Sequence, residues 1–92
     1  MDEQIRVQPL GPHEYAAEVD EGQESTHHRV VVRDDVFYGP EFAETSEARL
    51  VEETMRFLLE RSPNTALPHD IDTGELAERD ERYLPELRLR VT

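Results

Sequence analysis

The chain has 92 residues, no cysteine, and 22 acidic against 10 basic side chains, a formal net charge of −12. A chain of this size forms one small domain with a limited core, and without thiols it has neither disulfides nor a thiolate metal site. So acidic a surface repels nucleic acid and anionic membranes. No apolar run approaches the roughly 20 residues of a membrane span, and MDEQIRVQP lacks a secretory signal pattern, so we expect a cytoplasmic protein with no nucleic-acid or membrane partner.

Apolar and polar residues alternate with period two in the first third of the chain. Three runs share this spacing: Ile5 and Val7; Tyr15, Ala17 and Val19; and His28, Val30 and Val32. Such alternation is typical of strands with one buried face, and Gly11-Pro12 and Asp20-Glu21-Gly22 separate the runs. The sequence predicts two or three antiparallel strands over residues 3–33, with a hairpin near Gly22.

The pattern also predicts a register for this hairpin. The preferred pairing sets Val19 opposite His28, and a shift by two would keep the same faces. The outer face then carries two opposite-charge pairs: Glu18 with Arg29, and Glu14 with Arg33. Pairs of this kind contribute about 0.2 to 1 kcal/mol each, so we expect the strand arginines to be neutralised by their neighbours.

A connector and then a helix follow the strands. We expect the connector, residues 34–44, to place its aromatic side chains under the helices. A helix is predicted over residues 45–62, where Thr45 or Ser46 can act as the N-cap and apolar residues recur at helical spacing from Val51 to Leu59. Pro63 disfavours helical geometry in the residue before it, so the helix should end there.

A second helix is predicted over residues 72–90, after a linker at residues 63–71. Asp72 and Glu75 have the spacing of a capping box, and Ile71 with Leu76 fits a hydrophobic staple. Pro85 should interrupt this helix, and residues 87–91 fit a strand as well as a helix. The predicted fold is α+β, with a small antiparallel sheet of two or three strands packed against two helices in a single domain, residues 1–92.

The order of these elements resembles a group of short uncharacterised bacterial proteins. The resemblance rests on a hairpin, the run LVEETMRFLLERSPNTAL and an aspartate-initiated helix ending in YLPEL, and it covers roughly residues 28–88. It implies an α+β organisation, and it implies no catalytic residue.

Histidines are the weak candidates for a metal site. His69 opens a His-Asp-Ile-Asp run like the adjacent ligands of some phosphohydrolases, but such sites need further histidines on other helices. His27 and His28 are neighbours, so on a regular strand they point to opposite faces and cannot share one ion. Because helix capping already accounts for Asp72, we expect no metal and no cofactor.

The remaining patterns favour a binding protein over an enzyme. The chain has no glycine-rich phosphate loop, no nucleophile elbow and no thiol, and acids are so abundant that no single pair indicates catalysis. The leading hypothesis is a non-enzymatic acidic protein-interaction module, either a homodimer or an accessory subunit. Its possible interface consists of Val36, Phe37, Tyr38 and Phe42. The alternative is a small transcriptional regulator or antitoxin-like protein of the ribbon-helix type, which would need Arg29 and Arg33 to be free.

Overall fold

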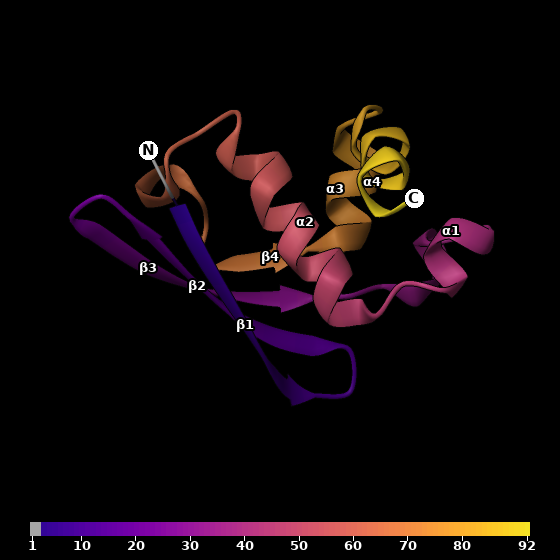
Figure 1. The fold of residues 1–92 in the computed structure, drawn as a ribbon, viewed down its shortest axis with the longest axis horizontal. Coiled ribbons are helices and arrows are strands. Elements are labelled where there is room, and N and C mark those ends of the chain that lie inside the picture. The colour runs from indigo at the N-terminus through magenta and orange to yellow at the C-terminus, as the bar shows by residue number, and fades with distance from the viewer. Residues whose placement is uncertain (1–2) are drawn as a thin grey trace.

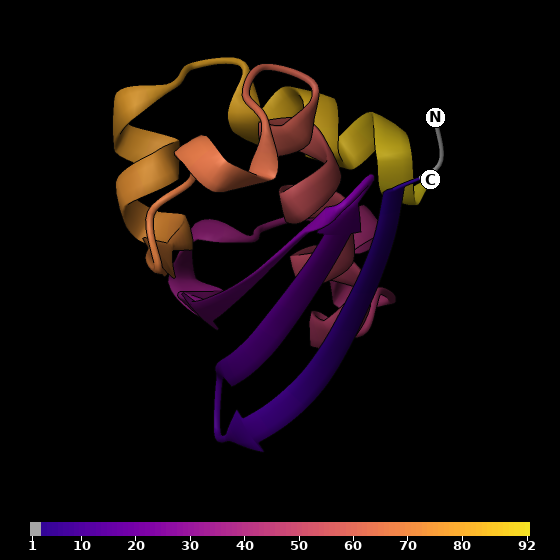
Figure 2. The same cartoon turned by 90° about the vertical axis from the view of Figure 1, so that its left-hand side faces the viewer.

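The computed structural model describes residues 3–92, with only the backbone of Glu3. Four strands form one sheet in the order β1-β2-β3-β4. They are β1 (Glu3–Gly11), β2 (Glu14–Glu21), β3 (Glu24–Val31) and β4 (Asp70–Asp72). The helices are α1 (Pro40–Ala43), α2 (Glu47–Leu59), α3 (Thr73–Arg79) and α4 (Tyr83–Val91), with short 3-10 turns η1 (Asp34–Val36) and η2 (Asn64–Ala66). The α+β class is confirmed, and the helices lie on one face of the sheet (Figures 1 and 2).

The sheet is mixed and larger than the two or three antiparallel strands predicted. β1, β2 and β3 form an antiparallel meander, and β4 pairs parallel with β3, with Val30 next to Ile71. A parallel partner requires a crossover connection, which here contains α2. Residues 70–72, predicted to be linker and helix start, form this strand because Ile71 is buried in the core.

The hairpin of β2 and β3 has the predicted faces but a register shifted by two. Ala17, not Val19, lies opposite His28, and Ala16 lies opposite Arg29. The preferred register was wrong because a shift by two leaves every side chain on the same face, so the apolar pattern does not distinguish the two pairings.

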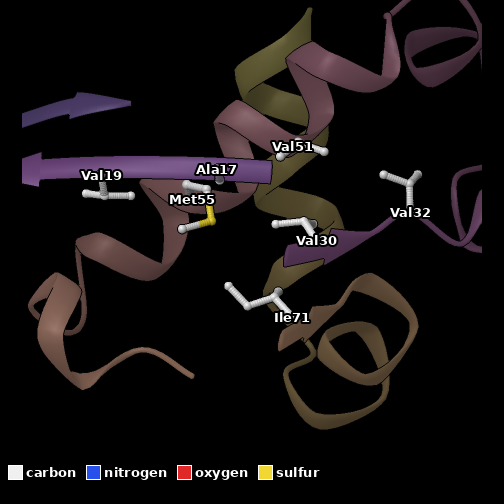
Figure 3. Close-up of a cluster of buried hydrophobic side chains, with 7 residues drawn as sticks. All are labelled: Ala17, Val19, Val30, Val32, Val51, Met55 and Ile71. Carbon is white, nitrogen blue, oxygen red and sulfur yellow. The ribbon is translucent and has the colours of Figure 1, made fainter. Parts of the chain in front are cut away.

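α2 connects two groups of buried side chains. Its Val51 and Met55 pack against the inner face of the sheet (Figure 3), while Leu50 and Phe57 pack against α4. The sheet-side group consists of Ala17, Val19, Val30, Val32, Val51, Met55 and Ile71. Full burial of an aliphatic or aromatic side chain contributes about 1.5 to 3 kcal/mol. Because α2 supplies buried side chains to both groups, it joins the two halves of the core.

The predicted first helix is shorter than residues 45–62. Ser46 is its N-cap, because its side chain accepts a hydrogen bond from the Arg49 amide at 3.1 Å. α2 ends at Leu59, before the turn that leads to Pro63. The predicted connector, residues 34–44, contains η1 and α1.

The predicted second helix, residues 72–90, is two helices. The break lies at residues 80–82, where Asp80 adopts an extended conformation. Pro85 does not interrupt a helix; it lies in the first turn of α4, where amides have no partner within the helix and a missing N–H costs little. Residues 87–91, which the sequence left open, are helical: Leu87 is buried while Leu89 is exposed, whereas a strand would place both on one face.

Candidate protein-binding surface

His28 has a structural role on the inner face of β3. Its Nδ1 lies 2.7 Å from the Pro68 carbonyl oxygen, which can only accept, so Nδ1 donates. Its Nε2 lies 2.9 Å from the Thr26 hydroxyl, which can donate to it. His28 is buried, and its bond to Pro68 fixes the segment before β4 against β3, while its bond to Thr26 stays within β3.

The other histidines do not join it. His27 points to the opposite face of the sheet, with its Nε2 3.8 Å from a carboxylate oxygen of Glu18. His69 is exposed, and its Nδ1 lies 3.3 Å from Asp70 Oδ1. Within residues 3–92, no three histidine or carboxylate side chains are arranged so that they could hold one metal ion. The structure therefore does not bring the candidate ligands His27, His28 and His69 together.

Asp72 is the N-cap of α3, as its spacing predicts. Its Oδ1 accepts hydrogen bonds from the amides of Gly74, at 2.8 Å, and Glu75, at 3.4 Å. The Arg33 guanidinium donates to the same carboxylate, with Nη2 2.8 Å from Oδ2. These Arg33 bonds are the main cause that lowers the pKa of Asp72, and the backbone amides lower it further. Asp72 therefore joins the end of β3 to the start of α3.

Gly74 allows this close approach. A Cβ atom at Gly74 would lie 3.1 Å from Arg33 Cγ and 3.1 Å from Asp72 Oδ1. Glycine is a poor helix former and weakens the first turn of α3. Because it has no side chain, however, it leaves room for Arg33 to lie across that turn.

Arg29 and Arg33 are engaged, although not by the predicted partners. Arg29 forms an ion pair with Glu14, diagonally across β2 and β3, and lies 4.0 Å from Asp70. The predicted pairs of Glu18 with Arg29 and Glu14 with Arg33 do not form, because of the shifted register. Glu18 instead lies 3.3 Å from Arg6 on β1.

Most of the positive charge of the chain is paired internally. Eight of the ten arginines form ion pairs with described carboxylates: Arg6, Arg29, Arg33, Arg49, Arg56, Arg61, Arg88 and Arg90. Because acids outnumber arginines by 22 to 10, many carboxylates are left without such a partner. Their location decides where the chain presents negative charge.

One group of these carboxylates lines a groove between η1 and α3, which we call the acidic groove. Its lining residues are Arg33, Asp35, Val36, Asp72, Gly74, Glu75, Ala77 and Glu78. Arg33 forms its ion pair with Asp72, and its charge also acts on the nearby Asp35 and Glu75. Among the described residues, Asp35, Glu75 and Glu78 form no ion pair of their own with an arginine. Val36 and Ala77 supply apolar surface between these carboxylates. The groove thus combines an excess of negative charge, four carboxylates against one arginine, with a small apolar surface.

The four predicted interface residues lie in different environments. Phe42 is buried, and half-buried Phe37 packs edge-on against it, with ring centroids 5.2 Å apart. Tyr38 has 66% of its surface exposed, so the expectation that the connector places its aromatic side chains under the helices is wrong for this residue. Val36 lines the acidic groove. In this conformation Phe37 and Phe42 therefore serve the core, and Val36 and Tyr38 are the accessible members of the set.

A buried polar pair accounts for the tyrosine of the YLPEL run. The Thr54 hydroxyl donates to the Leu50 carbonyl at 2.7 Å, so the Tyr83 hydroxyl, 2.8 Å away, donates to Thr54. Burial raises the pKa of Tyr83 well above its ordinary value. The pair lies between α2 and α4 and satisfies both hydroxyl groups within the core.

Glu53 is a buried carboxylate that the sequence analysis missed. Only 6% of its surface is exposed, and Arg49, Arg56 and Arg90 lie 3.2, 3.0 and 3.7 Å from its oxygens. Arg49 and Arg56 are at helical spacing from Glu53, which is a visible pattern in the sequence. Arg90 comes from α4, so the cluster joins the two helices and has no part in the acidic groove.

Comparison with known proteins identifies no relative. No family model matches the sequence, and neither a curated protein nor a solved structure matches it. The resemblance to a group of short bacterial proteins stays a prediction. Within residues 3–92, no helix combines the length and the apolar character needed to cross a bilayer.

Proposed function

We propose that the chain is a non-enzymatic protein-binding module that receives a basic segment of a partner in the acidic groove. The observation that carries this proposal is the distribution of charge. Eight of the ten arginines are used in internal ion pairs, while Asp35, Glu75 and Glu78 face the same groove without such a partner.

The chemistry of the groove favours an arginine or lysine side chain as the ligand. Such side chains carry an apolar stem and a charged end, which match the apolar surface of Val36 and Ala77 and the surrounding carboxylates. Charged hydrogen bonds to carboxylates are stronger than neutral ones. The net charge of −12 would also speed the approach of a basic partner at low salt.

The regulator alternative has less support from the contacts. A ribbon-helix protein reads DNA with side chains that project freely from a strand, whereas Arg29 is paired with Glu14 and Arg33 with Asp72. Freeing them would expose carboxylates beside the DNA phosphates. A protein partner needs no such rearrangement.

The test is affinity capture from an extract of the source cells, followed by mass spectrometry. The groove variant Glu75→Gln/Glu78→Gln is compared with the control Glu24→Gln/Glu44→Gln, which changes net charge equally at exposed acids outside the groove. We expect a basic partner that the wild type and the control retain and the groove variant loses. Equal loss in both variants, or no partner retained by the wild type, would contradict the proposal.

A further inference from the structure

β1 forms a long unpaired edge of the sheet. It has nine residues and pairs on one side with β2, and no described strand lies beyond it (Figure 2). The opposite edge, β4, has only three residues. An edge strand presents a row of unpaired amide and carbonyl groups that another strand can use.

The hydrogen bonds of β3 show which groups of β1 face outward. The Arg29 amide donates to the His69 carbonyl, on the β4 side, at 2.7 Å. In an antiparallel pair, opposite residues alternate between directing their amide and carbonyl groups toward each other and directing them away from each other. Arg29 directs its amide away from β2, so Ala16, which lies opposite Arg29, directs its backbone groups to β1. Gln8 lies opposite Ala16 and therefore faces β2.

By the same alternation, Ile5 and Val7 direct their amide and carbonyl groups away from β2. Pro9 is two residues after Val7 and also faces away from β2, so its missing N–H removes no hydrogen bond between β1 and β2. The position of Pro9 thus agrees with the assignment. It also limits the fully hydrogen-bonding part of the edge to the residues before it.

The apolar side chains of this edge are incompletely covered. Val19 and Ala17 are 0% and 1% exposed, whereas Ile5 and Val7, their partners in β1, are half-buried. Both lie on the face that α2 covers, and no residue that the structure describes lies beyond the edge to complete their burial. A further strand at this edge would cover them.

Charge favours a second copy of the chain as that strand. The β1 sequence EQIRVQPLG holds one acid and one arginine, so it is neutral within a chain of net charge −12. Two copies can therefore meet along β1 with little of the repulsion that their acidic faces would cause. A strongly basic partner gains no attraction at this edge.

We propose that β1 pairs antiparallel with β1 of a second copy, around a two-fold axis at Ile5, to give one continuous sheet. An axis at Arg6 would set two guanidinium groups opposite each other, which is unfavourable. An axis at Val7 would set Ile5 opposite Pro9, which has no amide hydrogen. An axis at Ile5 avoids both faults. It places Arg6 opposite Gln4 on the outer face, and it pairs Val7 with Glu3, so that Pro9 lies beyond the paired segment, residues 3–7.

The first test is sedimentation velocity over a range of chain concentrations. We expect a reversible dimer in the wild type and in Val7→Ala. In Val7→Pro the dissociation constant of the dimer should be more than about tenfold higher. Val7→Ala removes more apolar surface than Val7→Pro, but only proline removes the outward amide hydrogen, and neither change takes a donor from the β1–β2 ladder. Circular dichroism checks that each variant is folded.

A second measurement does not depend on any variant. Amide hydrogen exchange of the wild type should be slow at Arg6 and Gln8 at every concentration, since these amides face β2. The Ile5 and Val7 amides should exchange fast in dilute solution and slowly at high concentration. A strict monomer, a dimer that Val7→Pro leaves unchanged, or exchange at Ile5 and Val7 that is independent of concentration would overturn the proposal. None of these outcomes depends on the acidic groove.

Discussion

Replacing Asp72 separates two contributions that one side chain makes. Asp72→Ala removes both the cap of α3 and the ion pair with Arg33, whereas Asp72→Asn keeps a good capping group and removes the charge. Arg33→Gln removes the ion pair from the other side. The three variants together test whether the carboxylate acts as a cap, as an ion-pair partner, or as both.

The expected magnitudes follow from the contacts. Loss of an N-cap costs about 0.5 to 2 kcal/mol, and Asp72 caps two amides, of Gly74 and Glu75. An exposed ion pair is worth about 0.2 to 1 kcal/mol, and the low end applies because the Arg33 side chain is 54% exposed. Asp72→Ala should therefore lower the free energy of unfolding by about 1 to 2 kcal/mol, and Asp72→Asn and Arg33→Gln by less than about 1 kcal/mol.

The assay is urea unfolding, repeated with a chelator and at several pH values. The pKa of Asp72 is lowered in the folded state, so the advantage of wild type over Asp72→Asn should be complete above the ordinary aspartate pKa of about 4. It should disappear as the pH falls through the lowered pKa. Equal losses in Asp72→Ala and Asp72→Asn would refute the capping role, and wild-type stability that falls with chelator would show that the carboxylate binds a metal.

Three other predictions follow from the core and the surface charge. Thr54→Val should lower the free energy of unfolding by about 1 to 3 kcal/mol, and Tyr83→Phe by only about 0.5 to 1.5 kcal/mol, because only Thr54→Val leaves the buried Tyr83 hydroxyl without an acceptor. Urea unfolding that gives the reverse order would contradict the hydrogen-bond direction. Added salt should raise the melting temperature, more between about 10 and 50 mM than at higher concentration, by screening the net charge of −12, and a flat curve would mean that the acids are already compensated. Duplex DNA should not bind measurably at physiological salt, because Arg29 and Arg33 are paired with carboxylates; micromolar binding in a fluorescence titration that weakens in Arg29→Ala/Arg33→Ala would favour the regulator alternative.

Local signals in the sequence predicted the structure well. The N-cap Asp72 was predicted, and Ser46 was one of two predicted candidates with Thr45, because a cap depends on residues within one turn of the helix. The buried faces of β2 and β3 were predicted because alternation is a property of each strand alone. Both features depend on neighbours in the chain.

Features that depend on distant residues were missed. β4 has three residues, too few for a visible period, and its pairing with β3 spans some 40 positions. The sequence around Pro85 fits a proline that breaks a helix and equally a proline in the first turn of one. Only the break at Asp80 decides between the two.

The candidate surface was predicted only in part. Val36 was predicted as a possible interface residue, but of the groove carboxylates only Asp35 is its neighbour in the chain, whereas Glu75 and Glu78 belong to α3, about 40 residues later. With 22 acids in the chain, no local pattern distinguishes Glu75 and Glu78 from acids that pair with arginine. The groove arises because the Arg33 contact with Asp72 sets η1 beside α3.

The most direct test of the acidic groove as a binding surface is a nuclear magnetic resonance titration. The labelled chain is titrated with a short arginine-rich peptide and, separately, with a neutral peptide of equal length. We predict saturable shifts, for the cationic peptide alone, in the backbone amides of Asp35, Val36 and residues 74–78, and their loss in Glu75→Gln/Glu78→Gln but not in Glu24→Gln/Glu44→Gln. Shifts spread evenly over all exposed acids, or equal in the two variants, would contradict a defined binding surface.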